Sequence, residues 1–264
     1  HPSSLVPRPS EIGLRLAGAL WWFWDIRGHF TEARRRLETA LAASASIGTP
    51  ARRKALCAAA YLADLGNVQQ AAARGEESLA LCRQAGDRSG MAWSLAALLA
   101  VPWKQGDMAR TQALAAEALT LFRESDDHRG IACALSRLGS LGWLQGHWKR
   151  AEVLLEESLA LCHSAGYRWL SAGVLRTLGQ SALDAGHPER AGALIEESLA
   201  ISREFGVRSA GAYTLHALAR VAQSMGDNAR ATALFEESMA MSHEVGNAMG
   251  SALALVPLGD LALA

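Results

Sequence analysis

The sequence predicts an all-α fold, a solenoid in which one helix hairpin recurs about every 40 residues. Two observations predict it. Glycines recur at a nearly constant spacing, with apolar and small residues at helical spacing between them. In addition, no segment shows the sustained alternation of apolar and polar residues that is typical of a half-buried strand. The repeat spacing predicts the solenoid, and the missing alternation excludes a β-sheet.

The first element of the pattern is a set of glycines spaced 38, 40, 40, 40 and 40 residues apart. They are Gly28, Gly66, Gly106, Gly146, Gly186 and Gly226. A small side chain follows five residues after each glycine, at Ala33, Ala71, Thr111, Ala151, Ala191 and Ala231. Because a bulky side chain there would hold paired helices apart, we expect these residues to be buried between helices.

A second chain break follows 20 residues after each of these glycines, at Gly48, Gly86, Gly166, Gly206 and Gly246, with Asp126 in place of glycine once. We expect glycine to end each helix in the left-handed conformation, and Asp107 or Asn67 to cap the next helix. Breaks this short make neighbouring helices antiparallel. The sequence therefore predicts six helix pairs and one unpaired terminal helix over residues 249–264.

Composition excludes several classes of protein. The 264 residues carry 26 basic and 26 acidic side chains, and 50% are hydrophobic, so a disordered chain is excluded. No apolar run reaches the roughly 18 residues of a membrane span, and zero net charge gives no sign of direct nucleic-acid binding. The cysteines, Cys57, Cys82, Cys133 and Cys162, lie far apart, which suits a reducing compartment. We expect a cytoplasmic protein.

No motif for chemistry is present in the sequence. Phosphate-binding glycine loops, His-Glu-x-x-His, Cys-x-x-Cys and the nucleophile elbow are all missing. Repeated Glu-Glu pairs, such as Glu196-Glu197, are interpreted as a solvated helix face, because an active site is not usually copied four times. The sequence therefore predicts no enzyme, no metal and no cofactor.

Domain boundaries are expected at the N-terminus. Residues 1–10 are assigned to a tag or linker, since Leu5-Val6-Pro7-Arg8 is similar to a thrombin-cleavage sequence. Residues 11–264 are expected to form one repeat domain. Because the chain begins with His1 and ends in an apolar run, we expect it to be a fragment of a larger protein.

The repeats resemble the tetratricopeptide repeat. Leu-Gly in the first helix occurs at Leu138-Gly139, Leu178-Gly179 and Leu258-Gly259, and Gly-Asp at the turn occurs at Gly106-Asp107 and Gly226-Asp227. Ala33 and Ala40-Leu41 match the second helix. Serine replaces a family alanine at Ser78, Ser158, Ser198 and Ser238, and the repeat is about six residues longer than the usual ~34. The resemblance covers residues 11–264 and implies a right-handed superhelix.

The N-terminal residues resemble a narrower group. The run Leu16–Trp24, followed by Arg27-Gly28-His29 and Arg34–Glu38, is similar to the start of the repeat region in bacterial LuxR-type and MalT-like regulators. That resemblance implies an ATP-binding switch domain before the repeats and, in many members, a helix-turn-helix after them. Neither domain is present in this sequence.

The family resemblance implies that first helices line a concave binding surface. Projecting them gives Trp93, Trp103 and Trp143 as walls and Arg176, Gln180, Tyr213, His216 and Arg220 as polar contacts. An aromatic wall beside arginines suits a peptide carboxylate, a small anionic ligand or an acidic segment. The alternative is that the tryptophans pack between helices and the arginines are only solvated.

Four consecutive aromatic residues at Trp21–Trp24 cover every face of a helix. We therefore predict an interface at Trp21, Trp22 and Trp24, covered by a preceding domain, by a second copy or by residues 1–10. The alternative is an end-cap helix with one exposed tryptophan. Exposed repeat ends also predict self-association.

These observations together predict a non-catalytic binding module. Its leading role is the sensor or protein-interaction region of a bacterial signalling or transcriptional regulator, in contact with neighbouring domains. The alternative is a stand-alone adaptor that recruits a protein partner through its groove or its ends.

Overall fold

The computed structural model describes residues 9–27, 29–44, 49–63, 68–244 and 248–263, and its regular elements there are all α-helices. The predicted all-α fold is confirmed. The chain groups into two compact units, unit 1 ending at Ala134 and unit 2 beginning at Leu135. Each unit is described by itself below.

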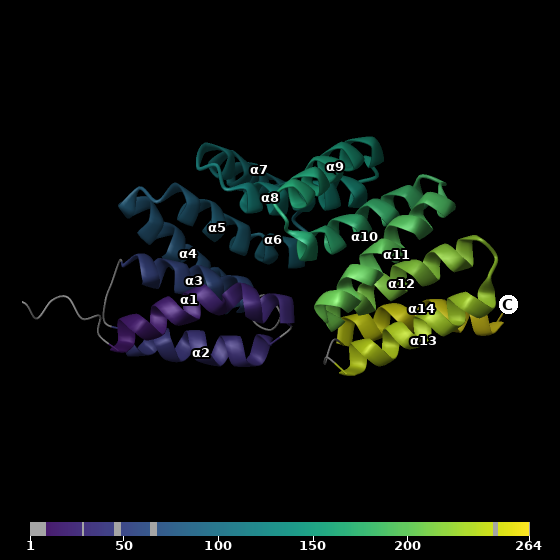
Figure 1. The fold of residues 1–264 in the computed structure, drawn as a ribbon, viewed down its shortest axis with the longest axis horizontal. Coiled ribbons are helices and arrows are strands. Elements are labelled where there is room, and N and C mark those ends of the chain that lie inside the picture. The colour runs from purple at the N-terminus through teal and green to yellow at the C-terminus, as the bar shows by residue number, and fades with distance from the viewer. Residues whose placement is uncertain (1–8, 28, 45–48, 64–67, 245–247, 264) are drawn as a thin grey trace, which may run out of the picture. The chain divides into compact units, whose positions relative to one another are not determined.

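Unit 1 holds the first helix pairs (Figure 1, purple to teal). Its helices are α1 (Pro9–Arg27), α2 (Phe30–Ala43), α3 (Pro50–Ala63), α4 (Val68–Ala85), α5 (Arg88–Leu98), α6 (Ala100–Lys104), α7 (Met108–Glu124) and the start of α8 (His128–Leu144). Unit 2 holds the rest of α8, then α9 (Trp148–Ser164), α10 (Arg168–Asp184), α11 (Pro188–Phe205), α12 (Arg208–Ser224), α13 (Asn228–Glu244) and α14 (Ala248–Leu263). First and second helices alternate as the hairpin repeat predicts.

One first helix differs from the prediction. The run leading to Gly106 was expected to be continuous, but it is divided at Leu99 into α5 and α6. Pro102 supplies the reason, because proline has no backbone N–H to donate to the carbonyl of Leu98.

The helix breaks follow the predicted glycines. Those in the described residues have φ between +63° and +87°, at Gly86, Gly106, Gly146, Gly166, Gly186, Gly206 and Gly226. Asp126 takes the same left-handed conformation with φ +52°, which aspartate tolerates better than most residues. Gly28, Gly48, Gly66, Gly246 and Asn67 lie outside the described residues. The predicted cap is confirmed at Asp107, whose carboxylate accepts from the N–H of Arg110 at 2.9 Å.

The core of each hairpin depends on small residues. The predicted contact residues Ala33, Ala71, Thr111, Ala151, Ala191 and Ala231 are all fully buried. On the facing helix, Gly179 makes a close approach: a Cβ added there would lie 2.4 Å from Cγ1 of Ile195 and 3.1 Å from the carbonyl oxygen of Ala191. The packing therefore has no room for a larger side chain at this crossing.

The serines that replace the family alanine join the two helices of a hairpin. The hydroxyl of Ser198 donates to the carbonyl oxygen of Ala172 at 2.7 Å, and Ser238 donates to that of Ala212 at 2.8 Å. Both serines are buried, so these bonds are shielded from water. The substitution thus adds a hydrogen bond from a second helix to the first helix of the same hairpin.

Partly or largely exposed ion pairs link successive second helices. Arg74 pairs with Glu38 at 2.8 Å in unit 1, and Arg230 pairs with Glu196 at 2.9 Å in unit 2. Arg203 and Glu237 repeat the arrangement at 3.2 Å. The predicted solvated glutamate face is therefore exposed, and part of it contacts the arginines of a neighbouring repeat.

Candidate functional site

The first helices of unit 1 bring three tryptophans together. The ring centroids of Trp21 and Trp22 lie 3.8 Å apart, and those of Trp22 and Trp93 lie 5.3 Å apart. Trp93 packs edge-on against the buried ring of Phe122 at 4.9 Å. The sequence placed Trp93 in a groove and Trp21 and Trp22 at an interface, whereas the structure joins all three in one cluster.

This cluster walls a pocket of about 340 Å³, here called the tryptophan pocket. Besides the three indoles, its lining includes the charged residues Arg53, Lys54, Asp87, Asp127 and Arg129. They come from α3, α8 and the turns before α5 and α8. The pocket therefore combines an apolar wall with groups of both charges.

Both carboxylates of the tryptophan pocket have protein partners. Asp87 pairs with Arg53 at 3.2 Å and accepts from the N–H of Gly90 at 2.9 Å. Asp127 accepts from Nε1 of Trp93 at 2.8 Å and from the N–H of Gly130 at 2.9 Å. These bonds fix the helix starts and the orientation of Trp93.

Arg129 has no such partner. Its guanidinium carbon lies 4.5 Å from the ring centroid of Trp22 and 5.4 Å from that of Trp93. Its Nε is buried and has no hydrogen-bond acceptor, and no ion pair in the described residues includes it. Sequence reasoning missed Arg129. It shares its repeat position with Ser89 and Trp169, so no recurring residue marked it.

In unit 2 the predicted polar contacts divide into two groups. The first is Arg176 with Gln180 and Tyr213, here called the arginine strip. Nη1 of Arg176 donates to Oε1 of Gln180 at 2.9 Å. Burial lowers the pKa of the Arg176 guanidinium, Tyr213 acts against this shift, and the charge of Arg137 adds to it. No carboxylate in the described part of the chain pairs with Arg176.

The second group is tied to one carboxylate. Asp184 accepts from Nε1 of Trp143 at 2.7 Å and from Nη2 of Arg220 at 2.9 Å. The ring of His216 packs against Phe235 at 5.2 Å, and burial and the neighbouring Arg220 lower its pKa, which favours the neutral form. The positive charge of Arg220 is thus already matched, so Arg176 is the arginine of the predicted set with its charge available.

Trp103 stands apart from these groups. It lies on the short helix α6, half-buried, and it does not line the tryptophan pocket with Trp93. The break at Leu99 separates the two tryptophans onto different helices. Its role as a wall stays a prediction.

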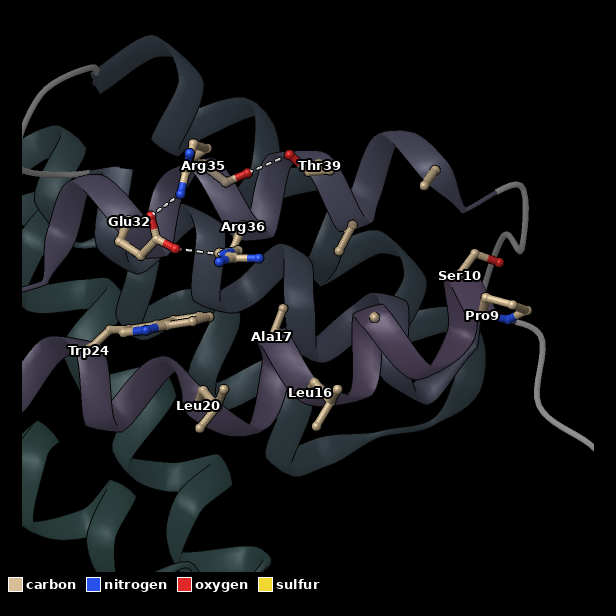
Figure 2. Close-up of a pocket in the computed structure, with 13 residues that line it drawn as sticks. Pro9, Ser10, Leu16, Ala17, Leu20, Trp24, Glu32, Arg35, Arg36 and Thr39 are labelled. Atoms are coloured by element: carbon tan, nitrogen blue, oxygen red, sulfur yellow. Dashed lines mark hydrogen bonds and ion pairs between the residues drawn. The ribbon is translucent and has the colours of Figure 1, made fainter.

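The N-terminal helix pair forms a larger groove of about 910 Å³ between α1 and α2, here called the end groove. Figure 2 shows Leu16 and Leu20 on α1 and Arg35 and Arg36 on α2, all of which line the groove. Leu16 is 57% exposed and Leu20 is 43% exposed. The two leucines therefore leave an apolar surface on this helix pair.

Of the tryptophans predicted as the interface, Trp24 lines the end groove and Trp21 and Trp22 line the tryptophan pocket. Trp21 is 4% exposed and Trp24 is 8% exposed, while Phe23 between them is 50% exposed. A partner at this end would therefore meet aliphatic residues and Phe23 first, because helix periodicity turns the tryptophans toward α2 and α3.

Cys57 and Cys162 have no feature of a reactive thiol. Burial raises the pKa of the Cys57 thiol to about 12 and that of Cys162 to about 11, so both stay protonated near neutral pH. Among the described residues, no cluster of three or more His, Cys, Asp or Glu side chains has the arrangement of a metal site. No helix in that part of the chain combines the length and apolar character needed to cross a membrane.

Comparison with known proteins adds a family. The tetratricopeptide repeat matches residues 100–163 and 170–244. No curated protein matches the sequence.

Several solved structures are similar in fold. NprR in complex with its cognate peptide NprX aligns with a TM-score of 0.70 at 15% identity, over 95% of this chain and 74% of that one. A Rap protein complexed with competence and sporulation factor gives 0.69 at 12% identity, over 98% and 76%. A signal transduction ATPase with a tetratricopeptide repeat sensor, from Pyrococcus horikoshii, gives 0.58 at 15%, over 94% and 41%.

Proposed function

Because this chain belongs to the tetratricopeptide repeat family, we propose that it is a non-catalytic module that binds a peptide or protein segment bearing carboxylates. The observation that carries the proposal is Arg176, a half-buried cation on a first helix whose hydrogen-bond partner is the neutral Gln180. A carboxylate from a bound segment would supply the missing counter-charge, and charge-assisted hydrogen bonds to arginine are among the strongest in proteins.

One of the similar structures supports a peptide ligand, and a second has a bound factor. NprR is bound to the peptide NprX, and the Rap protein is bound to competence and sporulation factor. The arginine strip in unit 2 would orient such a segment, with Gln180 and Tyr213 as polar contacts beside Arg176. A small anionic ligand could use the same contacts.

We further propose that the module is the sensor or interaction region of a larger bacterial signalling or transcriptional regulator that acts in the cytoplasm. The support is the ATPase with a tetratricopeptide repeat sensor, of which this chain spans 41%. Ligand binding would favour one arrangement of the repeats and so change the contacts with neighbouring domains.

The test selects short peptides from a random library on the wild-type chain. The best binder is then remade with asparagine and glutamine in place of its acidic residues. We expect the acidic peptide to bind the wild type about 10-fold or more better than its neutral analogue, since a hydrogen bond to a charged group contributes about 1.5–3 kcal/mol. Arg176→Gln should remove that preference, as measured by calorimetry.

Arg190→Gln is the matched control, because Arg190 lies on α11 and pairs with Glu156 at 3.3 Å outside the strip. Selection of neutral or basic peptides, or equal binding by Arg176→Gln, would refute the proposed role of Arg176.

The end groove supports a second candidate function. The chain would act as an adaptor that binds a protein partner or a second copy through its N-terminal helix pair. The residues equivalent to Leu20 are buried in three later repeats, at Leu98, Leu178 and Leu218, and half-buried at Leu138. The wild type is therefore expected to self-associate as its concentration rises. The double variant Leu16→Glu, Leu20→Glu is expected to remain monomeric, and light scattering measures both. Leu144→Glu, at an exposed leucine of α8, is the control. A wild type that is monomeric at high concentration contradicts self-association.

A further inference from the structure

We propose that the tryptophan pocket of unit 1 is a separate binding site for a small aromatic carboxylate. The proposal rests on different residues from the arginine strip of unit 2, so either assignment can fail without the other. It depends on Arg129, on the charge balance of the lining and on the shape of the apolar wall.

Arg129 has the hydrogen-bonding capacity that the site requires. A guanidinium has five N–H donors in a planar fork, and stacking on an aromatic ring uses its face while leaving its edge free. Arg129 lies over Trp22 at 4.5 Å, yet its buried Nε meets no acceptor among the described residues. A buried donor without an acceptor is destabilising. A carboxylate is the acceptor whose two oxygens match the fork.

The charge balance of the pocket also favours an anion. Its lining has the cations Arg53, Lys54 and Arg129 and the carboxylates of Asp87 and Asp127. Arg53 and Asp87 pair with each other, and Asp127 is held by Trp93 and the N–H of Gly130. Lys54 is exposed and makes no ion pair in the part of the chain that the structure describes. Because the donors to Asp127 are neutral, its charge remains, and the lining as a whole has one more cation than carboxylates.

The size and walls of the pocket select the rest of the ligand. A volume of about 340 Å³ is at the small end of ligand pockets, which span roughly 300–1,000 Å³. Trp21, Trp22 and Trp93 offer rings against which a flat apolar group can pack. Trp93 is fixed by its bond to Asp127 at 2.8 Å and by Phe122 beneath it. The wall is thus formed before the ligand binds.

A cationic ligand fits this site less well, although tryptophan faces attract cations. Arg129 already lies over Trp22 and Trp93, so a second cation would meet a like charge. The same position makes Arg129 a partner for an anion that packs beside the indoles.

The experiment compares two ligands of equal shape, N-acetyl-L-phenylalanine and its neutral amide. Binding to the full chain is followed by intrinsic tryptophan fluorescence and by calorimetry. We expect the acid to bind at least about 10-fold more tightly than the amide, and Arg129→Gln to abolish this difference. Arg137→Gln, a change on the same helix outside the pocket, should leave it intact. Tighter binding of phenylacetate would then indicate a free metabolite as the ligand. Tighter binding of a tripeptide ending in phenylalanine would indicate a peptide terminus.

Three outcomes would overturn the proposal: equal binding of acid and amide, unchanged discrimination in a folded Arg129→Gln variant, or tighter binding of phenethylammonium than of the acid. If Arg129→Gln alters the circular dichroism spectrum, the exposed Lys54→Gln variant replaces it, with an expected 2- to 3-fold loss for the acid alone, as a weak exposed ion pair implies. No loss with that variant would count against the site as well.

Discussion

Replacing Phe122 with alanine is expected to lower the free energy of unfolding by about 3–5 kcal/mol. The ring is fully buried and packs under Trp93 at 4.9 Å. Gly130 also fits against it so closely that an added Cβ would lie 2.1 Å from the Cδ1 atom of the ring. The surrounding helices cannot close such a cavity fully, so the lost contacts are not recovered. Urea unfolding, followed by circular dichroism, measures the change.

Cys162→Ala is the matched control, since Cys162 is buried at the same position of the next repeat. Only one heavy atom is removed there, and we expect a loss of about 1 kcal/mol. A Phe122→Ala loss no larger than that of the control would mean that the ring is not a central packing element. Because Phe122 supports Trp93, the variant should also weaken binding of N-acetyl-L-phenylalanine in the tryptophan pocket.

Gly179→Ala is expected to be the second large change, with a net loss of about 1–2 kcal/mol. The added methyl group would meet Ile195 at 2.4 Å and the backbone oxygen of Ala191 at 3.1 Å. Overpacking of this kind costs about 1–3 kcal/mol, which the better helix propensity of alanine offsets by up to about 1 kcal/mol. The thermal unfolding midpoint of the variant measures the difference.

The same helix provides the control for Gly179. Gly173 also lies within α10, but an added Cβ there would have no neighbour within 4 Å. Gly173→Ala should therefore stabilise the protein by about 0.5–1 kcal/mol through helix propensity alone. If both variants changed stability in the same direction, the close crossing of α10 and α11 would not be the cause of the stability change in Gly179→Ala.

The fold could be predicted because it depends on residues that recur. Gly106 and Gly186 end helices in the left-handed conformation, and Ala151 is buried at the helix contact, as their spacing indicates. The break at Leu99 was not predicted, since Pro102 is a single residue outside the repeat pattern. Periodicity averages over repeats, so it does not reveal a feature that occurs once.

The site was predicted only in part, for the same physical reason. Register along the first helices placed Arg176 and Gln180 on one face, where they are hydrogen-bonded, but it gave no information on which charges are already paired. Arg220 was predicted as a polar contact for a ligand, and in the structure it pairs with Asp184. Arg129 was missed because its surroundings come from helices distant in sequence. Which charges pair and which rings stack depends on the tertiary structure, so the repeat pattern does not reveal it.

The ion pairs between successive second helices make the mechanical response of each unit depend on its solvent. Arg74–Glu38 and Arg230–Glu196 are partly or largely exposed, so their attraction weakens as the Debye length falls from about 8 Å at physiological ionic strength to about 3 Å at 1 M salt. The serine bonds at Ser198 and Ser238 are buried and escape this screening. Added electrolyte would therefore weaken the contacts between successive second helices. The contacts between the two helices of one hairpin would keep their stiffness.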